Sequence, residues 1–75
     1  MITLSDIACG ESCRVLRLNL EGAALQRVLA MGFLPKLKIK VLRNAPLFDP
    51  LEVLINKTMV AIRRSEAALI EVESL

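Results

Sequence analysis

Few residues of this sequence could carry out chemistry, and the two cysteines are the first to consider. Cys9 and Cys13 form a Cys-x-x-x-Cys pair, and the chain has no histidine. Thiolates are soft metal ligands, but a structural zinc site needs four ligands and this pair supplies two. We interpret the pair as reduced thiols, with Cys13 in a small core position, in preference to a metal or redox role. No cofactor and no tight metal site are expected.

The lack of histidine also removes most catalytic groups. Nucleophile pairs of the Ser-His and Cys-His type need the imidazole as their general base. The sequence shows no other activated nucleophile and no acid–base pair. We therefore expect that the protein is not an enzyme.

A row of lysines is the second chemical feature. The segment 36–41 reads KLKIKV, and its period of two predicts a strand with one face on the core. The outward row is Lys36, Lys38 and Lys40, followed by Arg43. This face makes a small nucleic-acid-binding barrel the alternative function. A solvated face is favoured, because no aromatic residue is interleaved to stack on bases and lysines discourage edge-to-edge aggregation. The net charge of +2 adds little attraction for a polyanion, so no nucleic acid is expected.

The composition bounds the size of the core. A chain of 75 residues predicts a single domain, 1–75, which buries about 60% of its unfolded surface. Because 55% of the residues are hydrophobic, some of them should lie on the surface, in a partner site or a homo-oligomer contact. No apolar run reaches the ~20 residues that a membrane span needs, and the N-terminus lacks a signal pattern. We expect a cytoplasmic protein without direct membrane insertion.

The first half of the chain predicts a strand and a helix. Residues 11–18 read as a strand with a bulge, because the alternation of apolar residues shifts within it. An amphipathic helix follows at about 22–31. Gly32 is expected at its C′ position in a Schellman motif, with Phe33 against Val28, and Pro35 prevents continuation.

The second half predicts three strands. Residues 51–55 alternate, and 58–63 are nearly continuously apolar, which predicts burial on both faces. Asn56-Lys57 should form the hairpin turn between them. Because Lys57 occupies the position where a type I′ turn prefers glycine, the turn is expected to be strained or of another type. Ser65 is the expected N-cap of a short helical turn near 65–68, before a last strand at 69–73. The fold class is therefore mainly β, and five short strands suggest a small barrel with one inserted helix.

Three segments together resemble one protein family. They occur in one order with matching spacing, at 27–35, 45–50 and 61–67. Their shared residues are Arg27, Leu29, Met31, Gly32, Phe33, Pro35, Ala45, Pro46, Asp49, Pro50, Ala61, Ile62, Arg63, Glu66 and Ala67. This combination is similar to the FeoA family, and the resemblance covers the chain from Leu4 to Glu73.

The resemblance implies an SH3-like β-barrel and an accessory role in ferrous iron uptake. Its implied partner is a FeoB-type membrane transporter, contacted at the cytosolic GTP-binding domain. The sequence departs from the family at three turns, where Lys36, Phe48 and Lys57 stand in place of a usual glycine.

The loop 44–50, NAPLFDP, is the remaining candidate binding feature. Pro46 and Pro50 restrict its backbone, and Asp49 can accept hydrogen bonds in an Asx-type turn. Leu47 and Phe48 have no such structural reason, and Phe48 cannot adopt positive φ without strain. Either the pair covers one end of the barrel, or it anchors a partner. Our hypothesis is that Leu47 and Phe48, with Leu34, belong to a partner-binding surface.

Overall fold

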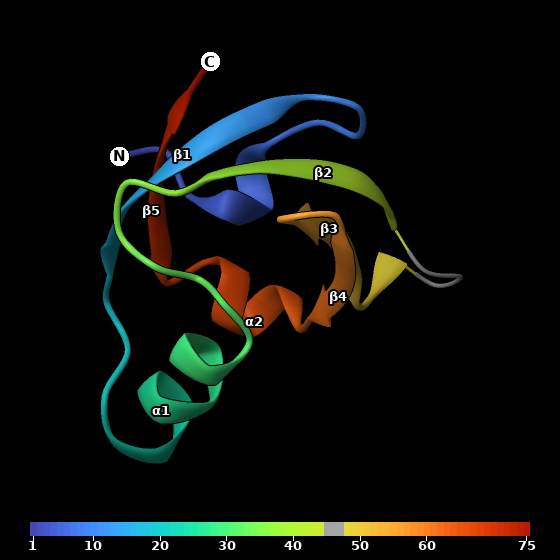
Figure 1. Cartoon of the computed structure of the whole chain (residues 1–75). Helices are drawn as coiled ribbons and strands as arrows, with labels where there is room; N and C mark the ends of the chain where they lie inside the picture. The colour runs from blue at the N-terminus through green and yellow to red at the C-terminus, as the bar shows by residue number, and fades with distance from the viewer. Residues whose placement is uncertain (45–47) are drawn as a thin grey trace.

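Five strands form one antiparallel sheet in a computed structural model of the chain, which describes residues 1–44 and 48–75. The strands are β1 (Ser12–Leu18), β2 (Lys38–Asn44), β3 (Leu51–Ile55), β4 (Thr58–Ile62) and β5 (Ile70–Ser74). Their order in the sheet is β4-β3-β2-β1-β5. In Figure 1 the sheet curves around a common interior, with β1 and β2 above it and β3 and β4 on the right. The mainly-β, five-stranded prediction is confirmed.

Three short helices complete the fold: η1 (Leu4–Asp6), α1 (Gly22–Ala30) and α2 (Arg64–Ala67). Figure 1 shows α2 across the lower end of the interior, with α1 below it in the connection from β1 to β2. The 3-10 turn η1 is absent from the prediction, although Thr3-x-x-Asp6 is a capping-box pattern: the Thr3 N–H donates to Asp6 Oδ2 at 2.9 Å. No helix in the described part of the chain is long and apolar enough to cross a membrane.

The end of α1 confirms the Schellman motif. Gly32 has φ 106°, its N–H donates to the carbonyl of Leu29 at 3.0 Å, and the N–H of Phe33 donates to that of Val28 at 3.3 Å. Phe33 and Val28 are both fully buried. The segment that follows α1 is thus held to the core by the buried Phe33 side chain.

The core contains aliphatic side chains from every strand, together with Phe33 and buried residues of the helices. The predicted alternation of β3 is confirmed, because Leu51, Val53 and Ile55 are buried. Cys13 is fully buried on β1, as expected. The predicted bulge in this strand is also present, as a register shift between Val15 and Arg17.

Strand β4 contradicts the prediction of burial on both faces. Only Ile62 is buried on it, Val60 is half-buried, and Met59 is 53% exposed. The apolar composition of β4 therefore does not mean that it lies in the interior. Met59 and Ala61 alternate with Val60 and Ile62, so they lie on the outer face of the strand and meet solvent. Strand β4 is also an end strand of the sheet.

Three turns keep a glycine-like backbone without a glycine. Lys36 and Phe48 both have φ 74°, and Lys57 has φ 71° after Asn56 at 47°. Phe48 therefore adopts a backbone conformation that is strained for a residue with a side chain. Positive φ at residues 56 and 57 is the type I′ geometry, so of the two predicted alternatives the turn is the type I′ form, with Lys57 in the left-handed region, rather than a turn of another type. Lys36 lies in a turn, and for this reason β2 begins at Lys38 rather than at the predicted residue 36.

This strain predicts that Lys57→Gly stabilises the fold. A non-glycine residue in the left-handed region costs about 1–3 kcal/mol, and glycine costs about 0.5–1 kcal/mol in unfolded-chain entropy. We expect the free energy of unfolding in urea to rise by about 0.5–1 kcal/mol. The control is Lys40→Gly within β2, which should lower it. A loss of stability in Lys57→Gly would contradict the argument.

Candidate functional site

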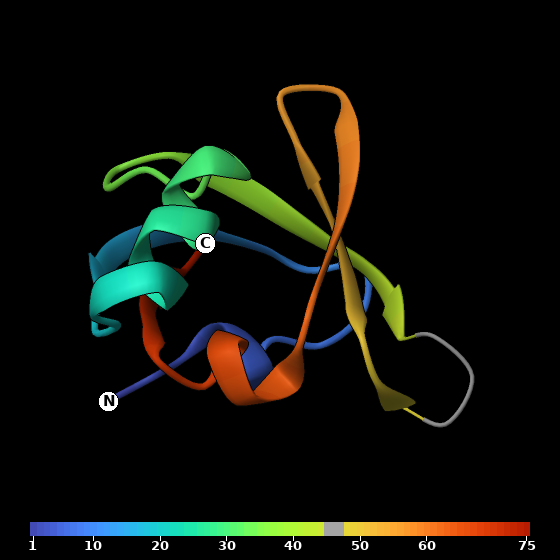
Figure 2. The same ribbon diagram turned by 90° about the horizontal axis from the view of Figure 1, so that it is seen from below.

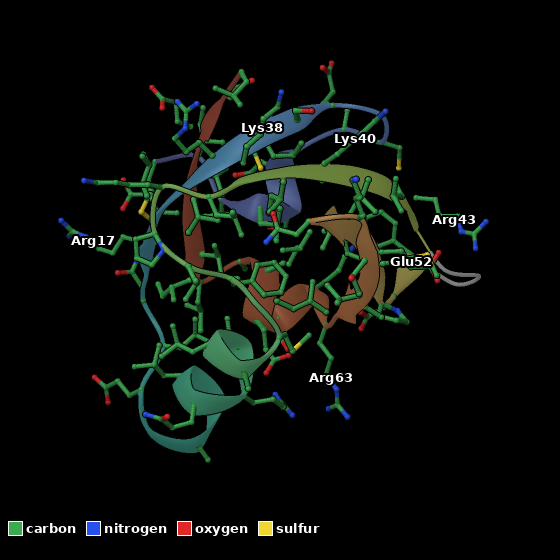
Figure 3. The ribbon with its side chains drawn as sticks, viewed as in Figure 1. Arg17, Lys38, Lys40, Arg43, Glu52 and Arg63 are labelled. Carbon is green, nitrogen blue, oxygen red and sulfur yellow. The ribbon has the colours of Figure 1, made fainter. Side chains whose placement is uncertain are left out.

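Residues from all three motif segments meet around one surface hollow of about 240 Å³. The residues that line it are Arg27 and Met31 from α1 and its end, Pro50, Ala61 on β4, Arg63, and Glu66 on α2. In Figure 3 the Arg63 side chain extends away from the sheet, on the side of the molecule where α1 lies. We call this the motif hollow.

An ion pair joins two helices beside the motif hollow. The guanidinium of Arg27 on α1 contacts Oε2 of Glu66 on α2. Glu66 is 9% exposed, whereas the Arg27 side chain is 56% exposed. A buried carboxylate needs a partner to offset its lost hydration, and Arg27 supplies the positive charge. The pair therefore holds α1 against α2.

A second set of contacts fastens the N-terminus of α2 to the segment before β3. Oδ1 of Asp49 accepts a hydrogen bond from the Arg64 N–H at 3.0 Å. Ser65 is therefore not the N-cap: α2 begins at Arg64, Arg63 is its N-cap residue, and Asp49 provides the acceptor. The expected role of Asp49 as an acceptor is confirmed, but its partner lies 15 residues along the chain rather than in the same loop.

The Arg64 side chain makes further contacts with the segment before β3 and with the N-terminal segment. Its Nε donates to the Phe48 carbonyl at 2.8 Å, and Nη1 donates to the Ser5 carbonyl at 3.2 Å. The guanidinium also lies over the Phe48 ring, 3.6 Å from its centre. Phe48 is nevertheless 61% exposed. One face of its ring thus rests on Arg64 and much of the rest meets solvent.

The other predicted partner-binding residues lie elsewhere. Leu34 is 51% exposed, in the connection from α1 to β2. Figures 1 and 2 place this connection and the segment before β3 on opposite sides of the molecule. Three predicted residues, Ala45, Pro46 and Leu47, lie outside the described residues.

The lysine face forms a separate hollow of about 380 Å³. It is lined by Ser12, Lys38, Ile39, Lys40, Leu54, Asn56 and Lys57. Figure 3 shows Lys38 and Lys40 on the opposite side of the molecule from Arg63. The basic surface and the motif hollow are therefore distinct sites.

The two cysteines do not form a disulfide. Cys9 is exposed and Cys13 is buried, and burial raises the pKa of the Cys13 thiol to about 11. Within 1–44 and 48–75 there is no group of three or more Cys, Asp or Glu side chains placed to hold a metal ion.

The thiols should therefore differ in reactivity. At pH 8 the Cys13 thiol stays protonated and shielded, whereas Cys9 is accessible. An aromatic disulfide reagent should titrate one thiol in the native protein and two in denaturant. Rapid modification of Cys13 without unfolding would contradict its burial.

The Arg27–Glu66 pair predicts strong coupling in a double-mutant cycle. Arg27→Ala should cost about 1–3 kcal/mol, because the Glu66 carboxylate loses its partner while buried. The double Arg27→Ala, Glu66→Ala variant should be more stable than the sum of the single changes implies. The control cycle is Arg14 with Glu73, an exposed pair at 3.6 Å, for which we expect coupling below about 0.5 kcal/mol. Equal coupling in the two cycles would contradict the structural role.

The chain matches known proteins over nearly its whole length. The FeoA domain profile matches residues 2–74. A fusion of Fe(2+) transport protein A with the Fe(2+) transporter FeoB, from Porphyromonas gingivalis, is 39% identical over 93% of this chain. The chain spans 8% of the length of that fusion protein.

Solved structures give the same result. Iron(II) transport protein A from Clostridium thermocellum is 35% identical, with a TM-score of 0.93 over 99% of this chain and 46% of that one. FeoA from Chlorobium tepidum is 38% identical, with a TM-score of 0.90 over 99% and 70% of the two chains. Stenotrophomonas maltophilia FeoA, described as an SH3 domain protein and complexed with zinc, is 27% identical with a TM-score of 0.77 over 97% and 91%. The SH3-like fold is thus confirmed, and the chain belongs to the FeoA family.

Proposed function

We propose that this chain is a non-enzymatic accessory protein of ferrous iron uptake, which acts by binding the cytosolic GTP-binding domain of a FeoB-type transporter. The observation that supports this most directly is the Porphyromonas gingivalis relative, a fusion of Fe(2+) transport protein A and the transporter FeoB in one polypeptide. A covalent link holds two modules at high local concentration. A FeoA chain that is separate from its transporter must achieve the same association through surface contacts, on the cytoplasmic side of the membrane.

The side chains of the motif hollow suit binding rather than catalysis. It holds two arginines, one carboxylate already paired with Arg27, and the apolar Met31, Pro50 and Ala61. No residue in this set is an activated nucleophile with a base beside it. The proposed work of the chain is therefore to dock and to position its partner.

Exposed apolar side chains are the proposed contact residues. Phe48 is large and 61% exposed, whereas Leu34, 51% exposed, lies on the opposite side of the molecule (Figures 1 and 2) and would need a separate contact. Leu47 remains a hypothesis outside the described residues. Phe48 is the stronger anchor, because Arg64 holds its backbone and one face of its ring before any partner arrives. A contact that is ordered in advance costs less entropy on binding.

Binding to the transporter domain is the test of this function. The isolated GTP-binding domain of a FeoB-type transporter should retain the chain in a pull-down, with and without guanine nucleotide. Phe48→Ser should weaken binding by about tenfold or more, as expected for an apolar anchor. Leu69→Ser, at an exposed leucine in the turn before β5, is the control and should bind as the wild type does. If Phe48→Ser lowers thermal stability and leaves binding unchanged, Phe48 serves the fold.

The alternative function is nucleic-acid binding through the hollow lined by Lys38, Lys40 and Lys57. This surface lacks a stacking platform, because neither of the chain's two aromatic residues, Phe33 and Phe48, is among the residues that line it. Retention on DNA or RNA that falls steeply with salt, together with no retention by the transporter domain, would favour the alternative.

A further inference from the structure

Strand β4 presents an outer backbone edge that pairs with no further strand among residues 1–44 and 48–75. It lies at the end of the sheet and pairs with β3. Thr58 and Ile55 are partners across the two-residue turn, so they form a hydrogen-bonded pair, and alternation makes Val60 with Val53 the next. The N–H and C=O groups of Met59 and Ala61 consequently point away from β3. Backbone groups that point outward in this way can accept an additional strand.

This edge lacks the usual protection against pairing. Natural edge strands carry charged side chains, proline or a covering segment. The other end strand, β5, has both Glu71 and Glu73, and the N–H of Val72 donates to the carbonyl of Ile2 in the N-terminal segment at 2.9 Å. The residues of β4, by contrast, read TMVAI, without a charge or a proline. In Figure 2 the turn end of the β3–β4 hairpin stands clear of the helices.

Side chains beside the edge indicate what an added strand would carry. Met59, 53% exposed, offers an apolar contact near the turn. The motif hollow adjoins Ala61 and adds Met31 and Arg63. Lys57 precedes the strand and Arg63 follows it, so positive charge lies at both ends of an apolar centre.

The charges argue against a second copy of this chain as the occupant. An antiparallel pairing of two β4 strands over their full length is centred on Val60, and this register places Lys57 of each copy opposite Arg63 of the other. Like charges directly opposite one another destabilise a strand pair, and this arrangement has two such positions. A segment with acidic residues at these positions has the opposite, favourable arrangement.

We propose that the β4 edge and the motif hollow bind an extended segment of the partner protein, apolar at its centre and flanked by acidic residues, as an additional antiparallel strand. This inference rests on the proposed function, because it assigns the segment to the FeoB-type transporter. Main-chain hydrogen bonds from Met59 and Ala61 supply affinity, and the flanking cations select the acidic segment.

The test compares two variants that add the same charge. Met59→Lys places a charge on the edge, whereas Leu16→Lys changes a leucine of similar exposure, 47%, on β1, which is paired on both sides. With the intact FeoB-type transporter, we expect Met59→Lys to bind at least about tenfold more weakly and Leu16→Lys to bind as the wild type does. Met59→Pro removes one outward N–H without removing a bond to β3, and should also bind more weakly.

Hydrogen exchange provides an independent measure on the complex. The amides of Met59 and Ala61 should exchange at least about tenfold more slowly when the transporter is bound, and those of Val60 and Ile62 should change little. If the wild type binds and both Met59→Lys and Met59→Pro bind equally well, this inference is overturned and the proposed function is retained. The same holds if the wild type binds but the two outward amides stay unprotected. Absence of wild-type binding would overturn both. If the chain does not bind the transporter but associates with itself, and Met59→Lys abolishes this self-association, the occupant of the edge is a second copy and the inference is overturned.

Discussion

The structure depends on hydrogen-bond and ion-pair partners for α2, a helix only four residues long. Isolated helices of this length are unstable in water, so α2 exists because other segments hold it. Asp49 accepts the amide of Arg64, the Arg64 side chain reaches the carbonyls of Phe48 and Ser5, and Glu66 pairs with Arg27. The segment before β3, the N-terminal turn and α1 are thereby joined at one place. The motif hollow forms beside this junction.

The turns add a second constraint, because the fold requires left-handed backbone at positions where the chain has no glycine. Lys36, Phe48 and Lys57 all adopt it, so the geometry of these turns is set by the strands that they connect rather than by local preference. At Phe48, the residue with this backbone conformation has its ring over Arg64 and stays largely exposed. The same backbone with glycine would offer no apolar side chain at this position.

A small domain that is rich in apolar residues cannot bury all of them, and this one leaves a part of the excess on β4 and at Phe48. Both lie close to the motif hollow, since Leu51 and Ile62 pair and bring the segment before β3 to the end of β4. An edge, an aromatic anchor and two arginines thus lie within one region. The lysine surface lies on another side of the molecule (Figure 3), so the two proposed functions use different surfaces.

Local pattern alone was sufficient for the elements whose signals lie within a few residues. The Schellman end of α1, the alternation of β3 and the bulge in β1 follow from side-chain size, period and backbone preference. The FeoA resemblance likewise depends on residue spacing. Only the tertiary structure decided that β4 is an end strand, that Asp49 rather than Ser65 caps α2, and that Arg27, Ala61 and Glu66 meet. These facts depend on which distant segments become neighbours, and an apolar strand has the same composition whether a second strand covers its edge or solvent does.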